Sequence, residues 1–111
     1  TGYDITTLEI IQTTGMVSNE NVIPEKYSLG QNYPNPFNPR TVVSFSLPVD
    51  SKVSIKVYDV MGREVQTLVN ERMQAGRYSV QWDAGAYPNG VYFYQMNTNG
   101  YRETMRMILI K

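Results

Sequence analysis

The chain has no histidine and no cysteine. These absences remove the commonest general base of enzymes, the histidine-activated cysteine nucleophile and the main zinc ligands. They also exclude disulfide bonds, although 111 residues are enough for one domain whose core needs none. We therefore expect neither catalysis nor a bound cofactor or metal.

Excess charge and long apolar runs are missing as well. Ten basic and ten acidic residues balance to a net charge of zero, which leaves no electrostatic footprint for nucleic acid or an anionic membrane. No apolar run approaches the roughly 20 residues of a membrane-spanning helix. The sequence opens on Thr1 without a signal peptide, so we expect a processed or partial piece of a longer precursor.

Acidic residues that could carry chemistry occur singly. Glycoside hydrolysis needs two facing carboxyl groups, and only the fold could bring Asp59 and Asp83 together. A calcium site at Asp50 or Asp59 would lack the D-x-D-x-D-G spacing of a calcium loop. We expect Asp50 and Asp59 to be turn residues whose hydrogen bonds are satisfied within the chain.

Alternation of apolar and polar residues is the main pattern present. Val53, Ile55 and Val57, for example, alternate with polar neighbours, which is typical of a half-buried strand. The pattern predicts strands over residues 41–47, 52–59, 64–69, 77–83, 91–97 and 101–110, with a loop at 70–76 and a turn at 84–90. We predict a soluble all-β fold, an immunoglobulin-like two-sheet antiparallel sandwich of about seven short strands. Its predicted core is Val43, Phe45, Val53, Ile55, Val57, Val80, Trp82, Met105, Met107 and Leu109.

The pair Asn99-Gly100 is the strongest hairpin signal in the sequence. As the two central residues of a tight turn, these residues set the register of the strands on either side. The predicted pairs are Thr98 with Tyr101, Tyr94 with Met105, Phe93 with Arg106, Tyr92 with Met107 and Val91 with Ile108.

The domain organisation follows from composition. Residues 3–13 are rich in β-branched side chains and predict one strand, so we assign 1–13 to an upstream domain or to an added edge strand. Residues 14–26 mix Gly, Ser, Asn, Glu and Pro and are interpreted as a linker. Residues 27–111 then form the domain.

The stretch Q-N-Y-P-N-P-F-N-P-R-T at 31–41, called the proline arm below, is stiff. Proline fixes its own φ, restricts the preceding residue and cannot donate a backbone hydrogen bond. The arm therefore cannot be a helix or a central strand, and we expect it to lie along a sheet edge as a brace. Tyr33 and Phe37 are its two large anchors, and Asn32, Asn35 and Asn38 are expected to satisfy nearby backbone groups through Asx-type turns.

The arm also begins a family resemblance. Residues 27–41, K-V-Y-D-V-M-G-R-E-V at 56–65, A-G-R-Y-S-V-Q-W-D at 75–83, N-G-V-Y-F-Y at 89–94 and the closing M-R-M-I-L-I-K stand in the order and spacing of one family. Together they resemble a type A C-terminal sorting domain of the type IX (Por) secretion system. The resemblance implies the same sandwich and a non-catalytic module that directs a cargo protein to the cell surface or medium.

The same resemblance implies partners and sorting-signal residues. The partners are outer-membrane translocon and sortase-like components of the type IX system and an upstream cargo domain in the same precursor, reached through the periplasm and outer membrane. In type A domains a sortase-like peptidase commonly removes the module, and the 14–26 linker offers an extended backbone for that cut. The candidate sorting-signal residues are Asn32, Pro34, Asn35, Pro36, Phe37, Asn38, Pro39, Gly90, Val91, Tyr92, Met107, Ile108, Leu109, Ile110 and Lys111.

A rival interpretation uses the aromatic residues. Aromatic side chains on a flat sheet can stack on sugars or anchor a protein partner, so a structural or adhesive immunoglobulin-like module, including a glycan-binding one, is the alternative. The row consists of Tyr87, Tyr92, Phe93, Tyr94 and Tyr101. The export interpretation, in turn, uses the last strand: Ile108 and Ile110 beside Lys111 predict an open sheet edge suited to docking of a partner, for which strand addition is one mode.

Overall fold

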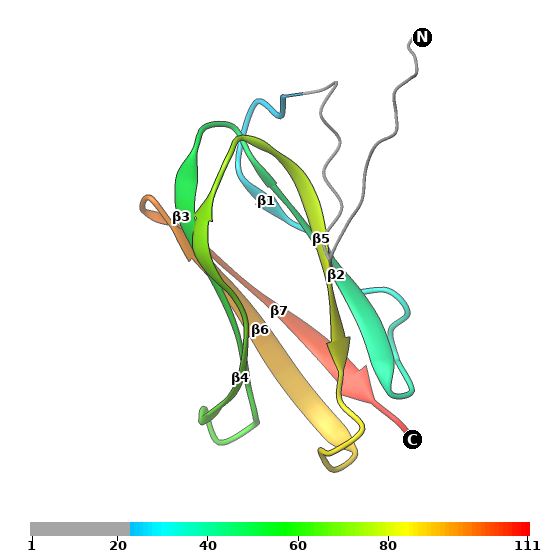
Figure 1. Ribbon diagram of the computed structural model, residues 1–111. Coiled ribbons are helices and arrows are strands. Elements are labelled where there is room, and N and C mark those ends of the chain that lie inside the picture. Colours follow the sequence, from blue (N-terminus) through cyan, green and yellow to red (C-terminus); the bar gives the residue numbers. More distant parts are fainter. Residues whose placement is uncertain (1–22) are drawn as a thin grey trace, which may run out of the picture.

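The protein is an all-β sandwich. The structure, a computed structural model, describes residues 23–111. Within that range the chain forms seven strands and no helix (Figure 1), and hence no helix that could cross a membrane. The strands are β1 (Ser28–Leu29), β2 (Arg40–Leu47), β3 (Ser51–Tyr58), β4 (Glu64–Met73), β5 (Gly76–Asp83), β6 (Gly90–Thr98) and β7 (Tyr101–Leu109).

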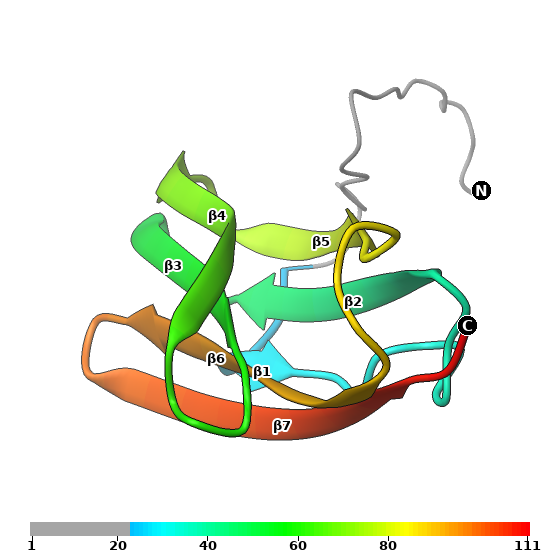
Figure 2. The ribbon, with the colours of Figure 1, turned by 90° about the horizontal axis from the view of Figure 1, so that it is seen from below.

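The strands pair into two antiparallel sheets. The smaller sheet has the order β1-β2-β5 and the larger one β4-β3-β6-β7, and Figure 2 shows the two layers from one end. In an immunoglobulin constant-type sandwich the fourth strand belongs to the sheet of the first, second and fifth strands. Here the fourth strand pairs with the third instead, so one edge strand has changed sheet while the sandwich is kept. The predicted fold class is confirmed.

The core lies between the sheets and follows the predicted alternation. Strand β3 shows it most regularly, since Val53, Ile55 and Val57 are buried while the intervening residues are partly or fully exposed. Of the predicted core, Val43, Phe45, Val53, Ile55, Val57, Trp82, Met107 and Leu109 are buried, and Val80 and Met105 are partly buried against them. The structure adds Leu29, Phe37, Leu47, Val69, Ala84, Tyr92, Tyr94 and Met96.

The β6–β7 hairpin has the predicted register in full. Thr98 pairs with Tyr101, and each further predicted pair is present. The turn is formed by Asn99 at φ 41° and Gly100 at φ 82°. Both values lie in the left-handed region, which asparagine and glycine tolerate best, so local turn chemistry alone sets this register.

Two element predictions are wrong. Strand β4 continues to Met73, so residues 70–73 are strand where a loop was predicted. This stretch has a polar sequence without alternation, because β4 is an edge strand whose side chains there are mostly exposed. The short β1 was also missed, because two residues carry no periodic signal. The predicted strand at 3–13 and the part of the predicted linker up to residue 22 lie outside the described residues. In the described part of that linker, Ile23 is exposed and Pro24 is buried.

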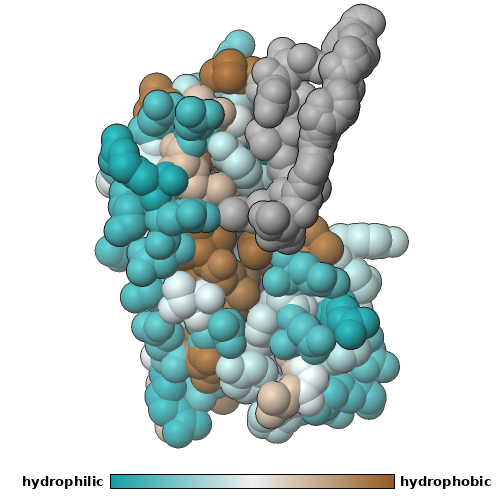
Figure 3. All heavy atoms as spheres, in the orientation of Figure 1, coloured by the Kyte–Doolittle hydropathy of each residue, from teal (hydrophilic) through white to brown (hydrophobic). Residues whose placement is uncertain are grey.

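The two long sides of the sandwich differ. Where β4 lies beside β5, apolar side chains are only partly buried, and Figure 3 shows a brown strip flanked by hydrophilic atoms on this side. The partly buried apolar residues of the two strands are Val65, Leu68, Met73, Tyr78 and Val80, whereas Val69 and Trp82 are buried in the core. The other side, where β1 lies beside β7, is covered by the proline arm.

Candidate functional site

The proline arm and the two residues before it pair first with the smaller sheet. Leu29 pairs with Phe45 on β2, and the backbone N–H of Gly30 donates to the carbonyl of Ser44 at 2.8 Å. Tyr33 and Val42 then exchange two backbone hydrogen bonds of 3.0 and 2.9 Å. The prolines that follow have no N–H to continue this ladder, and the arm leaves the edge of β2.

The same arm then bonds to β7 in the larger sheet. The side-chain amide of Gln31 donates to the carbonyl of Arg106 at 2.8 Å. The backbone N–H of Ile108 donates to Oδ1 of Asn35 at 3.0 Å. Phe37 completes the contact through both of its backbone groups, donating to the carbonyl of Ile108 at 2.9 Å and accepting from the N–H of Ile110 at 3.0 Å. The arm therefore joins the two sheets along one side of the sandwich.

Phe37 anchors the arm. Its ring is 2% exposed and lies 5.8 Å from that of Trp82, measured between ring centroids. The other predicted anchor, Tyr33, is 80% exposed, so that prediction is wrong. The pairing of Tyr33 with Val42 explains the error, because it places Tyr33 on the outer face of β2 beside the exposed Val42.

The arm's asparagines have unequal roles. Asn32 is buried, and its side-chain amide donates to the carbonyl of Pro34 and to Oγ1 of Thr41, as expected for a local bond. Asn35 is exposed and reaches β7 rather than its own turn, so its predicted local role is wrong. Asn38 is exposed.

The loop at 84–90 extends this arrangement to the C-terminal residues. The backbone N–H of Lys111 donates to Oδ1 of Asn89, and its Nζ donates to the carbonyl of Gly85. Tyr87 in the same loop donates its hydroxyl to the carbonyl of Val65 on β4. One loop thus connects the last residues to the β4 side of the molecule.

The predicted site residues form one continuous region, called the C-terminal corner below. It comprises residues 32–39 of the arm, 90–92 at the start of β6 and 107–111 at the end of β7, which pair or pack with one another. Asn32, Phe37, Tyr92, Met107 and Leu109 are buried in it, and Pro39, Val91 and Ile108 are partly buried. The exposed members are Tyr33, Pro34, Asn35, Pro36, Asn38, Gly90, Ile110 and Lys111.

Two predictions about binding surfaces are wrong. The end of β7 near Ile108 is not an open edge, because its outward backbone groups are bonded to Asn35 and Phe37. The aromatic row is not an exposed face either, since Tyr92 is 4% exposed and Tyr94 fully buried. Both tyrosines pack into the core because their alternate positions on β6 face inward.

Asp50 and Asp59 are turn residues with hydrogen bonds inside the chain, as predicted, whereas Asp83 is the last residue of β5. The backbone N–H groups of Ala75 and Gly85 donate to Asp50 and Asp83, respectively. The bond from the backbone of Gly85, together with Arg40, lowers the pKa of Asp83, which needs no partner from outside the chain. Across residues 23–111 no group of three or more acidic, histidine or cysteine side chains is placed to hold a metal ion.

Sequence reasoning missed Gln31, Thr41 and Asn89. Their bonds to Arg106, Asn32 and Lys111 each depend on where the chain returns in space, which has no local signal. Turn chemistry at Asn89-Gly90 was the one available clue, and it indicates a bend but not the strand end that the bend receives.

Comparison with known proteins agrees with this geometry. No curated protein matches the chain. The family model described as a secretion system C-terminal sorting domain matches residues 31–111, which span the proline arm, all the strands from β2 onward and the C-terminal corner. The chain therefore belongs to the family of C-terminal sorting domains, the sorting signals of type IX secretion.

Proposed function

We propose that this domain carries an attached cargo protein across the outer membrane by presenting the exposed half of the C-terminal corner to the type IX machinery. The proposal rests on the way in which three separate segments of the sequence come together in the fold. Residues 32–39, 90–92 and 107–111 lie far apart in the sequence, yet hydrogen bonds and packing join them into one region. A partner that binds this region recognises the folded domain, because the sorting signal is assembled only when the domain folds.

Burial divides the corner into two kinds of residue. Phe37, Met107 and Leu109 are inaccessible to a partner, so their part is to hold the corner together. Ile110 and Lys111 are exposed at its surface, where a partner can reach them. We propose recognition by the exposed members and positioning by the buried ones.

The domain itself carries out no chemistry in this proposal. Asp59 and Asp83 accept bonds from nearby backbone groups, and Asp50 accepts one from Ala75 between β4 and β5. The machinery supplies any cleavage that separates the domain from its cargo. The 14–26 linker remains our proposed place for such a cut, and cargo released or anchored there would reach the cell surface or medium. The adhesive alternative loses its main support, because Tyr92 and Tyr94 are not available to stack on a ligand.

The test is export of a reporter. A signal peptide, a reporter enzyme and residues 1–111 are fused and expressed in a host with a type IX system and in the same host with its translocon inactivated. Fractionation should place the reporter outside the first host and in the periplasm of the second. Periplasmic retention in both hosts would refute the proposed function.

A pair of matched variants tests the corner. Ile110→Ser with Lys111→Gln alters two exposed residues of the corner, whereas Val49→Ser with Lys52→Gln makes the same chemical changes at exposed positions around the β2–β3 turn. That turn follows Leu47, at the end of β2 opposite to Arg40, where the proline arm enters the strand. Export should fall for the first pair and stay unchanged for the second. Equal export of both would show that Ile110 and Lys111 are not read.

A further inference from the structure

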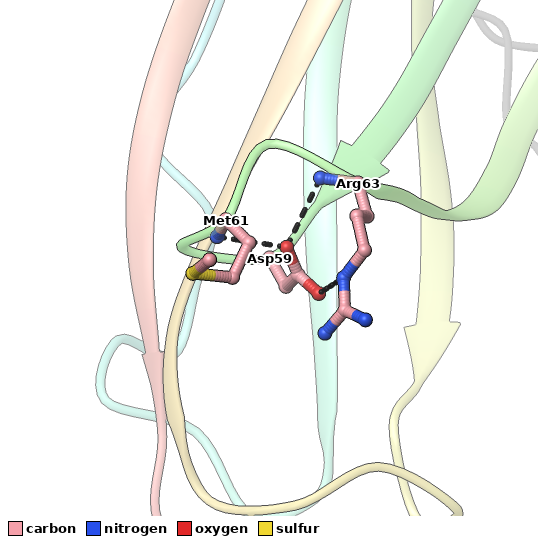
Figure 4. Close-up of polar contacts among 3 residues, drawn as sticks. All are labelled: Asp59, Met61 and Arg63. Carbon is pink, nitrogen blue, oxygen red and sulfur yellow. Dashed lines mark hydrogen bonds and ion pairs between the residues drawn. The ribbon is translucent and has the colours of Figure 1, made fainter.

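The β3–β4 turn, Asp59 to Arg63, is held rigidly by one carboxylate. Oδ1 of Asp59 accepts the backbone N–H groups of Met61 at 2.9 Å and Arg63 at 3.0 Å, and Oδ2 accepts Nε of Arg63 at 2.9 Å (Figure 4). Two backbone bonds between Asp59 and residues 62 and 63 close the turn. The bond from the backbone of Arg63 is the main reason why the pKa of Asp59 is lowered. The carboxylate therefore stays ionised, and able to accept these bonds, at a lower pH than an ordinary aspartate.

This rigid turn exposes two apolar side chains. Val60 is 67% exposed and Met61 76% exposed. Folding does not require apolar residues there, because Asp59 supplies the turn's side-chain acceptor and Gly62, at φ 82°, its left-handed residue. A β-branched valine is in fact unfavourable in a turn compared with asparagine or serine. The pair thus calls for an explanation outside the folding of the domain.

A pocket adjoins the turn. Its volume is about 360 Å³, and its lining residues are Asp59, Arg63, Glu64, Val65, Tyr87, Pro88 and Tyr92. The charges on its rim are paired within the chain, Arg63 with Asp59 and Glu64 with Lys56. The 84–90 loop, which holds Lys111, forms the far wall, so this surface continues into the C-terminal corner.

We propose that the Val60–Met61 turn is a docking element that inserts into an apolar pocket of a protein partner. Three features define that partner. The turn is convex and preorganised, so the partner is concave and the turn loses little entropy on binding. The neighbouring charges are already paired, so the partner contact is apolar rather than electrostatic. The pocket beside the turn accepts one side chain of the partner in return.

A lipid surface fits these observations less well. Insertion into an anionic bilayer draws on a wide apolar face and unpaired cations. The turn offers two apolar side chains, and its one cation, Arg63, is paired with Asp59. A protein pocket, by contrast, gains most from a few well-packed anchors.

The first test measures binding of the labelled full chain to sheared outer-membrane fragments from a type IX host. We expect saturable binding that Val60→Ser with Met61→Ser weakens about tenfold or more. Met61→Leu, which keeps the apolar area, should retain it. Ile23→Ser with Val49→Ser, a control at two other exposed apolar positions, should also leave it unchanged. Unchanged thermal unfolding of each variant shows that the fold is kept.

Defined outcomes overturn the proposal. Absence of binding, or equal binding by the Val60/Met61 double variant, removes the docking role. Binding to protein-free vesicles of phosphatidylethanolamine and phosphatidylglycerol that depends on the same residues assigns the turn to lipid instead. Insensitivity of binding to added salt supports an apolar contact, and steep loss with salt contradicts it.

The link of this turn to export rests on the proposed function, whereas its binding does not. In the reporter assay the Val60/Met61 double variant should lower export and the Ile23/Val49 control should not. If even the unchanged domain leaves the reporter in the periplasm, the proposed function fails while the binding result still decides the docking role.

Discussion

At the scale of single residues, Trp82 is the side chain on which most of the aromatic core depends. It is 3% exposed, and its ring centroid lies 5.6 to 5.8 Å from those of Phe37, Tyr87 and Tyr92. We expect Trp82→Ala to cost about 3–5 kcal/mol of unfolding free energy, because it removes these contacts and leaves a cavity. Chemical denaturation measures it, and an unchanged midpoint would contradict the core assignment.

Tyr94 links Gly30, the residue before the proline arm, to the core, and it makes stability depend on pH in the alkaline range. Its hydroxyl donates to the carbonyl of Gly30 at 2.6 Å, and burial raises its pKa from 10.0 to about 12. The folded state therefore holds the proton more tightly than the unfolded chain. This contribution is complete below pH 10 and is lost as the pH rises from 10 to about 12.

Tyr94→Phe separates the two effects. At neutral pH we expect a loss of about 0.5–1.5 kcal/mol, because the hydrogen bond between Gly30 and β6 is removed. Between pH 10 and 12 the variant's unfolding free energy should fall less steeply than that of the unchanged chain. Denaturation curves across this range provide the measurement, and parallel pH profiles would show that Tyr94 is not the titrating group.

At the scale of elements, the proline arm is a brace that one side chain fixes. Phe37→Ala should release it, increase proteolytic cleavage within residues 31–39 and cost about 3–5 kcal/mol, since the ring is fully enclosed. Tyr33→Ala, two prolines earlier in the same arm, should change stability by less than about 0.5 kcal/mol because Tyr33 is exposed. Limited proteolysis compares the two variants, and equal cleavage would show that Phe37 does not hold the arm.

The sequence predicted elements well where their signal was local. The alternation in β3 and the Asn99-Gly100 turn depend on neighbouring residues, so both the buried face and the hairpin register could be predicted. The extension of β4 to Met73 could not, because an edge strand buries little of either face and loses its periodicity.

The candidate site was predicted by resemblance more than by physics. Its residues could be named, but the bonds from Asn35 and Phe37 to β7 join positions more than 70 residues apart, and no pattern in the sequence states which strand the arm reaches. Because the sequence does not show that the arm reaches β7, the expectation of an open edge at Ile108 was also wrong. Whether Tyr92 faced the core or a ligand likewise depended on which face of β6 the other sheet covered.

At the scale of the whole molecule, the end of β7 is part of the structure as well as of the proposed address. Deleting Ile110 and Lys111 removes the bond of Ile110 to Phe37 and the two exposed bonds of Lys111 to Asn89 and Gly85. Each lost bond should cost at most about 0.5–1.5 kcal/mol. Deleting from Ile108 also removes the buried Leu109 and its pairing with Gly90, and should cost at least about 2–5 kcal/mol more. Denaturation of both truncations measures this difference.

That difference decides how export experiments are interpreted. Stability of a domain this size is only about 5–15 kcal/mol, so the longer deletion threatens the fold itself. Retention of a reporter that lacks residues 108–111 would then report unfolding rather than loss of a contact. Similar stability of the two truncations would mean that Leu109 contributes little and would contradict its burial.

The direction of the arm along β7 has a mechanical consequence. Successive arm residues 31, 35 and 37 bond to β7 residues 106, 108 and 110 in the same order, and the bridge between Phe37 and Leu109 is parallel. A pull between the chain before the arm and the end of β7 therefore drives the two segments past each other in shear. Such a load falls on all these hydrogen bonds together, whereas a hairpin pulled at its open end breaks one bond at a time. The domain thus resists tension best along the line between the chain before the arm and its C-terminal end.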